Sequence, residues 1–193
     1  MWHLTILGPS GRIFVSGTVG TPEGFECGTY EIGPEADTPR KLLGGVYPDC
    51  GGGGGEVSPD GKSVLGHSGE FLCVTDLATG SARIIKGFGK GSVAAWSPDG
   101  KWIAVIRDGR VILVDPNTFK LRKIGGGGNL SIHWSPDGTK ILADKSQLSC
   151  MPYLYFESLA VVDLQTGVES VIKSSHCNVS GGFAGWIDPE AVR

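Results

Sequence analysis

The chain has 193 residues, a formal net charge of −3 and 40% hydrophobic residues. This length fits one domain that can bury a core without metals. No basic stripe is present, which argues against a nucleic-acid partner. No apolar run approaches the roughly 18 residues of a membrane-spanning helix, so we expect no membrane insertion.

The sequence Ser-Pro-Asp-Gly occurs three times, beginning at Ser58, Ser97 and Ser135, in steps of 39 and 38 residues. A fixed period of this length indicates a repeat architecture. A weaker copy begins at Gly8, and a degenerate one follows Trp186. Pro and Asp suit the early positions of a tight turn, and Gly adopts positive φ at little cost.

Short segments rich in Val and Ile follow each turn, and their length of about four to six residues favours strands over helices. Each repeat reads as four short strands joined by hairpin turns. In chain order, we predict repeats at about residues 3–48, 53–88, 92–126 and 130–176. The predicted first strands are at about 3–7, 53–57, 92–96 and 130–134, with one more at 182–187.

The string Trp-Ser-Pro-Asp-Gly, an apolar strand and then Val-Asp-x-x-Thr-Gly resemble the WD40-like repeat of TolB-type β-propellers. The best copies begin at Trp96 and Trp134, and the resemblance covers about residues 3–189. It implies an all-β fold, a β-propeller built from four-stranded antiparallel blades. Propellers of this kind serve as binding platforms, as envelope proteins and as gating domains on peptidases.

The repeats predict a single domain, residues 1–193, with four complete blades and a surplus inner strand at 182–187. TolB-like rings commonly have more than four blades. Two arrangements therefore stay open. In the first, the surplus strand latches the ring by pairing with the first blade. In the second, the chain is part of a larger ring, which homo-oligomerisation would complete.

The five cysteines fall at informative places in the repeat. Cys27 follows the loop between the second and third strands of the first blade, and Cys150 lies in the same loop of the fourth blade. Cys50 and Cys177 each lie in the segment that leaves the fourth strand of the same two blades. We therefore predict the disulfides Cys27–Cys50 and Cys150–Cys177. Cys73 lies in an apolar strand, which favours a free core thiol. Paired cysteines favour a periplasmic or extracellular location.

We predict no catalytic site, no metal site and no cofactor. The Gly66–Glu70 stretch superficially resembles a nucleophile elbow, but its fifth residue is Glu and a hairpin turn explains it better. Asp60, Asp99 and Asp137 recur at one repeat position, which favours turn capping, and so do Asp76, Asp115 and Asp163 at another. A metal site on Cys150, His176 and Cys177 lacks a fourth ligand. Glu56 and His133 lie on first strands, where they either face a central channel or are satisfied in a core.

One face of the predicted propeller carries irregular loops. These are residues 17–26, 44–55, 146–158 and 174–182, and they contain Tyr47, Asp49, Tyr153, Tyr155, Phe156 and His176. Variation on one face of a repeat protein is often its binding side. The aromatic residues either bind a partner or cover the core.

The sequence thus predicts a non-enzymatic TolB-like propeller that binds a protein, peptide or glycan outside the cytoplasm. Two alternatives remain. The chain is an accessory domain that gates substrate for a serine peptidase, or it is a partial propeller that completes its ring by homo-oligomerisation.

Overall fold

The computed structural model describes residues 2–7, 13–21, 24–32, 40–44, 56–68, 71–88, 93–128, 131–148 and 155–174. Within these ranges the chain forms strands β1 to β16 and no helix, as predicted. Accordingly, the described part of the chain has no helix that is long and apolar enough to cross a membrane.

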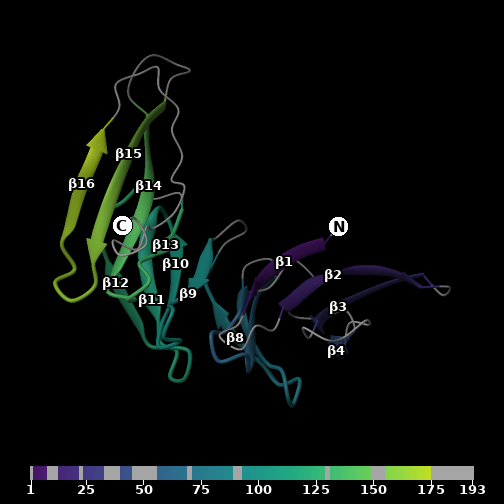
Figure 1. Ribbon diagram of the computed structural model, residues 1–193. Coiled ribbons are helices and arrows are strands. Elements are labelled where there is room, and N and C mark those ends of the chain that lie inside the picture. The colour runs from purple at the N-terminus through teal and green to yellow at the C-terminus, as the bar shows by residue number, and fades with distance from the viewer. Residues whose placement is uncertain are drawn as a thin grey trace, which may run out of the picture. The chain divides into compact units, whose positions relative to one another are not determined.

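The chain divides into two compact units, residues Met1–Gly91 and Ser92–Arg193. In each unit, two antiparallel sheets of four strands follow one another along the chain (Figure 1). We call these sheets blades 1 to 4. In each blade the strands pair in the order of the sequence, as in a meander.

The first unit contains blades 1 and 2. Blade 1 consists of β1 (Trp2–Leu7), β2 (Ile13–Thr21), β3 (Gly24–Ile32) and β4 (Arg40–Gly44). Blade 2 consists of β5 (Glu56–Val57), β6 (Ser63–Ser68), β7 (Phe71–Asp76) and β8 (Ala82–Lys86). The first strands of the two blades, β1 and β5, are in contact.

The second unit contains blades 3 and 4. Blade 3 consists of β9 (Ala94–Trp96), β10 (Ile103–Arg107), β11 (Arg110–Val114) and β12 (Leu121–Ile124). Blade 4 consists of β13 (His133–Trp134), β14 (Lys140–Leu148), β15 (Tyr155–Asp163) and β16 (Glu169–Ser174). The predicted strand at 182–187 lies outside the described residues, so the surplus strand and the single domain stay predictions.

The core of the second unit lies between blades 3 and 4. Blade 3 contributes Ala104 and Leu113, which pair with each other, and blade 4 contributes the paired residues Ile141 and Val162. The middle strands β10 and β11 are buried on both faces, and this explains their uninterrupted apolar sequence.

Hydrogen bonds between described residues also join blades 3 and 4. The indole N–H of Trp134 donates to the Ala95 carbonyl oxygen over 3.2 Å, next to the core. The Arg122 guanidinium donates to the Leu164 carbonyl oxygen over 2.7 Å. The backbone N–H of Gly126 donates to a carboxylate oxygen of Glu169 over 2.6 Å. The two blades are therefore fixed to each other from their first strands to their fourth.

The hairpins between second and third strands differ in length among the blades. Each of their strands has nine residues in blades 1 and 4, but five in blade 3 and six in blade 2. The sequence predicted loops at 17–26 and 146–158, and much of both segments is instead paired strand. Pairing satisfies the backbone groups of both segments and so outweighs the loop preference of their Gly and Pro residues.

Candidate functional site

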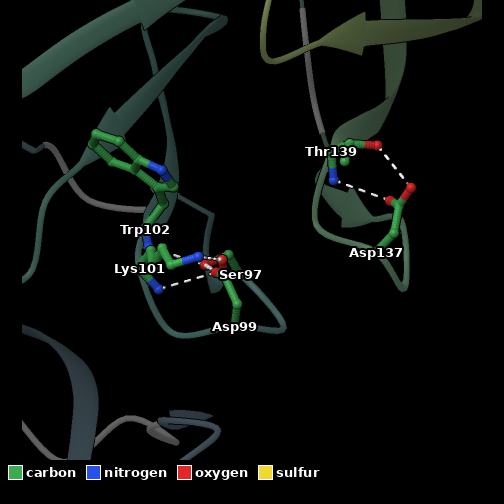
Figure 2. Close-up of polar contacts among 6 residues, drawn as sticks. All are labelled: Ser97, Asp99, Lys101, Trp102, Asp137 and Thr139. Atoms are coloured by element: carbon green, nitrogen blue, oxygen red, sulfur yellow. Dashed lines mark hydrogen bonds and ion pairs between the residues drawn. The ribbon is translucent and has the colours of Figure 1, made fainter.

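The Ser-Pro-Asp-Gly segments are turns that join the first and second strands of their blades. In blade 3, the Ser97 hydroxyl donates to Asp99 Oδ1 over 2.7 Å and accepts from the Trp102 backbone N–H over 2.9 Å. The Lys101 N–H donates to the same carboxylate oxygen over 3.1 Å (Figure 2). Gly100 closes the turn with φ of 70°, a conformation that favours glycine. The same Ser–Asp bond spans 2.6 Å in blades 2 and 4, at Ser58–Asp60 and Ser135–Asp137.

These hydrogen bonds hold the carboxylates of Asp99 and Asp137 in their charged form. The Ser135 hydroxyl, followed by the Thr139 N–H and hydroxyl, lowers the pKa of Asp137 to about 2. Figure 2 shows the two bonds from Thr139. Burial opposes the shift at Asp99, but hydrogen bonds from Lys101 and Ser97 outweigh it, so the pKa of Asp99 lies below its usual value. Acceptors that are ionised and already bonded are suited to capping a turn and unsuited to proton transfer at neutral pH.

A second set of Asp residues caps the turns between third and fourth strands. Asp163 Oδ1 accepts from the Thr166 N–H over 2.8 Å and from its hydroxyl over 2.9 Å. These bonds lower the pKa of Asp163, and the same two bonds from Thr79 lower the pKa of Asp76. The pKa of Asp115 is lowered first by the Asn117 N–H and then by Thr118. The capping interpretation of both Asp sets is therefore consistent with the geometry.

The predicted binding residues fall mainly beyond the part of the chain that the structure describes. Tyr47, Asp49, Tyr153 and His176 lie outside it, and so do Cys50, Cys150 and Cys177. The backbones of Tyr155 and Phe156 begin β15, where they pair with Leu148 and Gln147 of β14. Both aromatic residues therefore belong to the lengthened end of the blade 4 hairpin.

A buried ion pair joins this hairpin to the fourth strand of blade 4. Lys145 of β14 binds Glu169 of β16, and their side chains are only 7% and 16% exposed. The other oxygen of Glu169 accepts the Gly126 N–H. A Cβ on Gly126 would lie 3.2 Å from Glu169 and 3.4 Å from Lys145, so glycine lets this backbone approach the pair closely. No local sequence pattern predicts this cluster, because Lys145 and Glu169 lie 24 residues apart.

A second polar contact joins the start of blade 4 to its second strand. The Ser131 hydroxyl donates to Asp144 Oδ2 over 2.7 Å and accepts from the Asp144 N–H over 3.2 Å. Asp144 Oδ1 is buried and has no hydrogen-bond partner among the described residues. Glu56 and His133, the predicted channel residues, are half-buried on β5 and β13, and both have interaction partners.

The first three residues of the nucleophile-like stretch Gly66–Glu70 lie at the end of the hairpin that β6 and β7 form, as predicted, and Gly69 and Glu70 lie outside the described residues. Gly66, His67 and Ser68 are the last residues of β6, with His67 opposite Leu72 and Ser68 opposite Phe71. Pairing with β7 extends the strand to the end of the hairpin. These residues therefore lack the strand-to-helix geometry of a nucleophile elbow.

Cys73 differs from its prediction as well. It is fully buried in β7, as expected, but it is disulfide-bonded and is not a free thiol. The Thr75 hydroxyl lies 4.0 Å from its sulfur, and because a disulfide sulfur carries no proton, the hydroxyl is the donor. The prediction was wrong because an apolar strand predicts burial and says nothing about what the buried face meets.

No protein-family model matches the chain, and no curated protein matches it in sequence. Solved structures do match its fold. TolB from Acinetobacter baumannii is 22% identical, with a TM-score of 0.58 over 83% of this chain and 40% of TolB. A TolB-type protein from Agrobacterium tumefaciens is 17% identical, with a TM-score of 0.60 over 89% of this chain and 64% of that one.

The β-propeller domain of the Trilobed protease from Pyrococcus furiosus also matches, at 16% identity and a TM-score of 0.60, over 89% of this chain and 57% of that one. The chain thus spans between 40% and 64% of the length of these three structures. The four-stranded antiparallel sheets, the capped Ser-Pro-Asp-Gly turns and these matches lead to one conclusion: the chain has the fold of TolB-like β-propellers.

Proposed function

We propose that this chain is a non-catalytic binding module that recognises a protein, peptide or glycan in the periplasm or outside the cell. The observation that carries the proposal is the lengthened hairpin of blade 4. Each of its strands is four residues longer than its counterpart in blade 3, and the extension carries Tyr155 and Phe156. Blade 1 lengthens the same hairpin in the same way.

The extended hairpin is anchored well enough to present side chains. At its base, Lys145 and Glu169 are buried and paired, and Glu169 is also bonded to Gly126 of the neighbouring blade segment. A rigid base lowers the entropic cost of binding. Aromatic side chains beyond such a base give a large contact area with few torsions to fix, which suits an interface.

The location rests on two observations. The repeat resembles that of TolB-type propellers, a resemblance that implies envelope proteins among its relatives, and Cys73 is disulfide-bonded. Structural disulfides persist in oxidising compartments and are rare in the cytosol. Both observations support the periplasm or the cell exterior.

The test uses two probe sets, a random peptide library displayed on phage and an immobilised glycan array. The best binder from either set is measured against the wild-type chain and against the triple variant Tyr153→Ala, Tyr155→Ala, Phe156→Ala. We expect the triple variant to bind at least tenfold more weakly, with little change in melting temperature. Gln165→Ala, in the exposed turn between β15 and β16, is the matched control and should bind like the wild type.

Unchanged affinity together with a lowered melting temperature would show that the aromatic residues cover the core, and the proposal would then be wrong. The proposal would also be wrong if neither probe set yields a binder whose affinity the triple variant lowers.

Two alternative functions each relate to one of the comparisons. Similarity to the propeller domain of a protease favours an accessory domain that gates substrate for a peptidase. The short span relative to the matched structures is compatible with a partial ring that a second copy completes. A catalytic hydrolase domain in the same reading frame would support the first, and a dimer in light scattering after size exclusion would support the second.

A further inference from the structure

Cys73 has a disulfide partner, and the compact units limit which cysteine it is. Four other cysteines are present, Cys27, Cys50, Cys150 and Cys177. Cys73 belongs to the unit Met1–Gly91, which also contains Cys27 and Cys50, whereas Cys150 and Cys177 belong to the other unit. A partner within the same unit is therefore Cys27 or Cys50.

The repeat shows which way Cys73 faces. In blade 4, Val162 immediately precedes the capping Asp163 and packs into the core shared with blade 3, the preceding blade. Side chains alternate along a strand, so Ala160 shares the face of Val162. Cys73 precedes its own capping residue, Asp76, by the same three positions as Ala160 precedes Asp163. Cys73 therefore lies on the face of blade 2 directed toward blade 1.

Cys27 is poorly placed to reach this face. It lies within β3, opposite Thr18 of β2, and β3 and β7 belong to different sheets. Facing sheets pack about 10 Å apart. A disulfide joins Cα atoms that are at most about 7 Å apart. A bridge between these two strands would draw the sheets closer than packed side chains allow.

Cys50 is within reach. It lies in the connection between β4, which ends at Gly44, and β5, which begins at Glu56. Glu56, six positions after Cys50, pairs with Leu65, and the next residue of β6, Gly66, pairs with Cys73. Two strand spacings, about 10 Å, therefore separate Glu56 from Cys73. Residues 51–55 are all glycine and span up to about 17 Å when extended.

Blade 2 also has room for an incoming side chain beside Cys73. Its neighbour on the same face is Gly66, and a Cβ built there would meet no atom within 4 Å. Blades 3 and 4 carry Val105 and Ala143 at this position. The absence of a side chain at Gly66 leaves space where a second cysteine can approach.

We propose that Cys73 is bonded to Cys50, so that the disulfide ties the connection from blade 1 onto the inward face of blade 2, and that Cys27 remains a thiol. This replaces the predicted Cys27–Cys50 pair. Forming the bond removes two protons and two electrons from the two thiols. In a refolding buffer, oxidised glutathione accepts them and becomes two molecules of reduced glutathione.

Peptide mapping tests the pairing directly. The chain is refolded in glutathione buffer, its thiols are blocked with N-ethylmaleimide, and it is digested with trypsin without reduction. Cleavage after Arg12, Arg40, Lys41, Lys62 and Arg83 separates the three cysteines onto peptides 13–40, 42–62 and 63–83. We expect peptides 42–62 and 63–83 to be linked and peptide 13–40 to carry the maleimide. A link from 13–40 to either of the others would overturn the proposal.

Two matched variants provide a second measurement. Cys50→Ser opens a loop of about 23 residues and should lower the melting temperature by about 6–12 °C. Cys27→Ser should leave it within about 2 °C of the wild type. The reverse pattern would contradict the proposal. Should Cys50→Ser fail to fold, peptide mapping of the wild-type chain still decides.

Discussion

Lys145 and Glu169 form an ion pair across blade 4, two strands apart, with both side chains largely withdrawn from solvent. Removing one partner from a buried pair leaves the other charge without compensation, whereas replacing both with apolar residues is often nearly neutral. The pair therefore makes a sharp prediction about stability.

We expect Lys145→Met to lower the free energy of unfolding by about 3–5 kcal/mol. The double variant Lys145→Met, Glu169→Leu should recover most of this loss, except for about 1 kcal/mol from the hydrogen bond to Gly126. Urea unfolding of the wild type, both single variants and the double variant measures the coupling. Strictly additive losses would show that the two charges do not stabilise each other.

Gly167 offers a test of backbone strain separated from packing. Its φ is +71°, yet a Cβ there would meet no atom within 4 Å. Gly167→Ala should thus lose about 1–2 kcal/mol from the left-handed conformation alone. Gly127 has equal space and is not among the glycines with positive φ, so Gly127→Ala should be neutral or slightly stabilising. Thermal unfolding compares the two, and equal effects would contradict this explanation.

Asp137 makes the stability of the fold sensitive to acid. Its pKa of about 2 in the folded chain is below the ordinary value of 3.8, so between these values the unfolded chain binds more protons. The contribution of Asp137 is complete above about pH 4 and is lost as the pH falls through about 2. Asp137→Asn should therefore flatten the decline of melting temperature over this range.

Ser135→Ala supplies the control for that prediction. It removes the largest cause of the shift, so the pKa of Asp137 should move back toward its ordinary value in a carboxyl-carbon NMR titration. An unchanged titration would show that the Ser135 hydroxyl does not stabilise the charged form.

The capped turns were predictable because their causes are local. Ser97, Asp99 and Gly100 lie within four consecutive residues, and the hydrogen bonds that define the turn connect residues at most five positions apart. The repeat period predicted the positions of the strands, because each turn fixes where the next hairpin begins. The all-β fold followed from these two signals.

The remaining features depend on contacts between distant segments. Lys145 and Glu169 are 24 residues apart, and the sequence around each residue does not indicate that the two pair in a buried site. Cys73 is read correctly as a core position from its apolar strand, but its partner depends on the face that meets blade 1. The paired ends of β14 and β15 fall in the segment 146–158, which the sequence predicted as a loop inserted into the repeat, because pairing between two strands is not visible in either segment alone.

The hydrogen bonds between blades 3 and 4 have a consequence for how this half of the chain opens. In repeat proteins, stability is the sum of each repeat and its interface with the next. Hydrogen bonds cross that interface at Trp134, Arg122 and Glu169, from the first strands to the fourth. Separating blade 3 from blade 4 therefore breaks all of them. The backbone amides of β11 and β15 should therefore exchange with deuterium at a shared rate, as one cooperative opening unit.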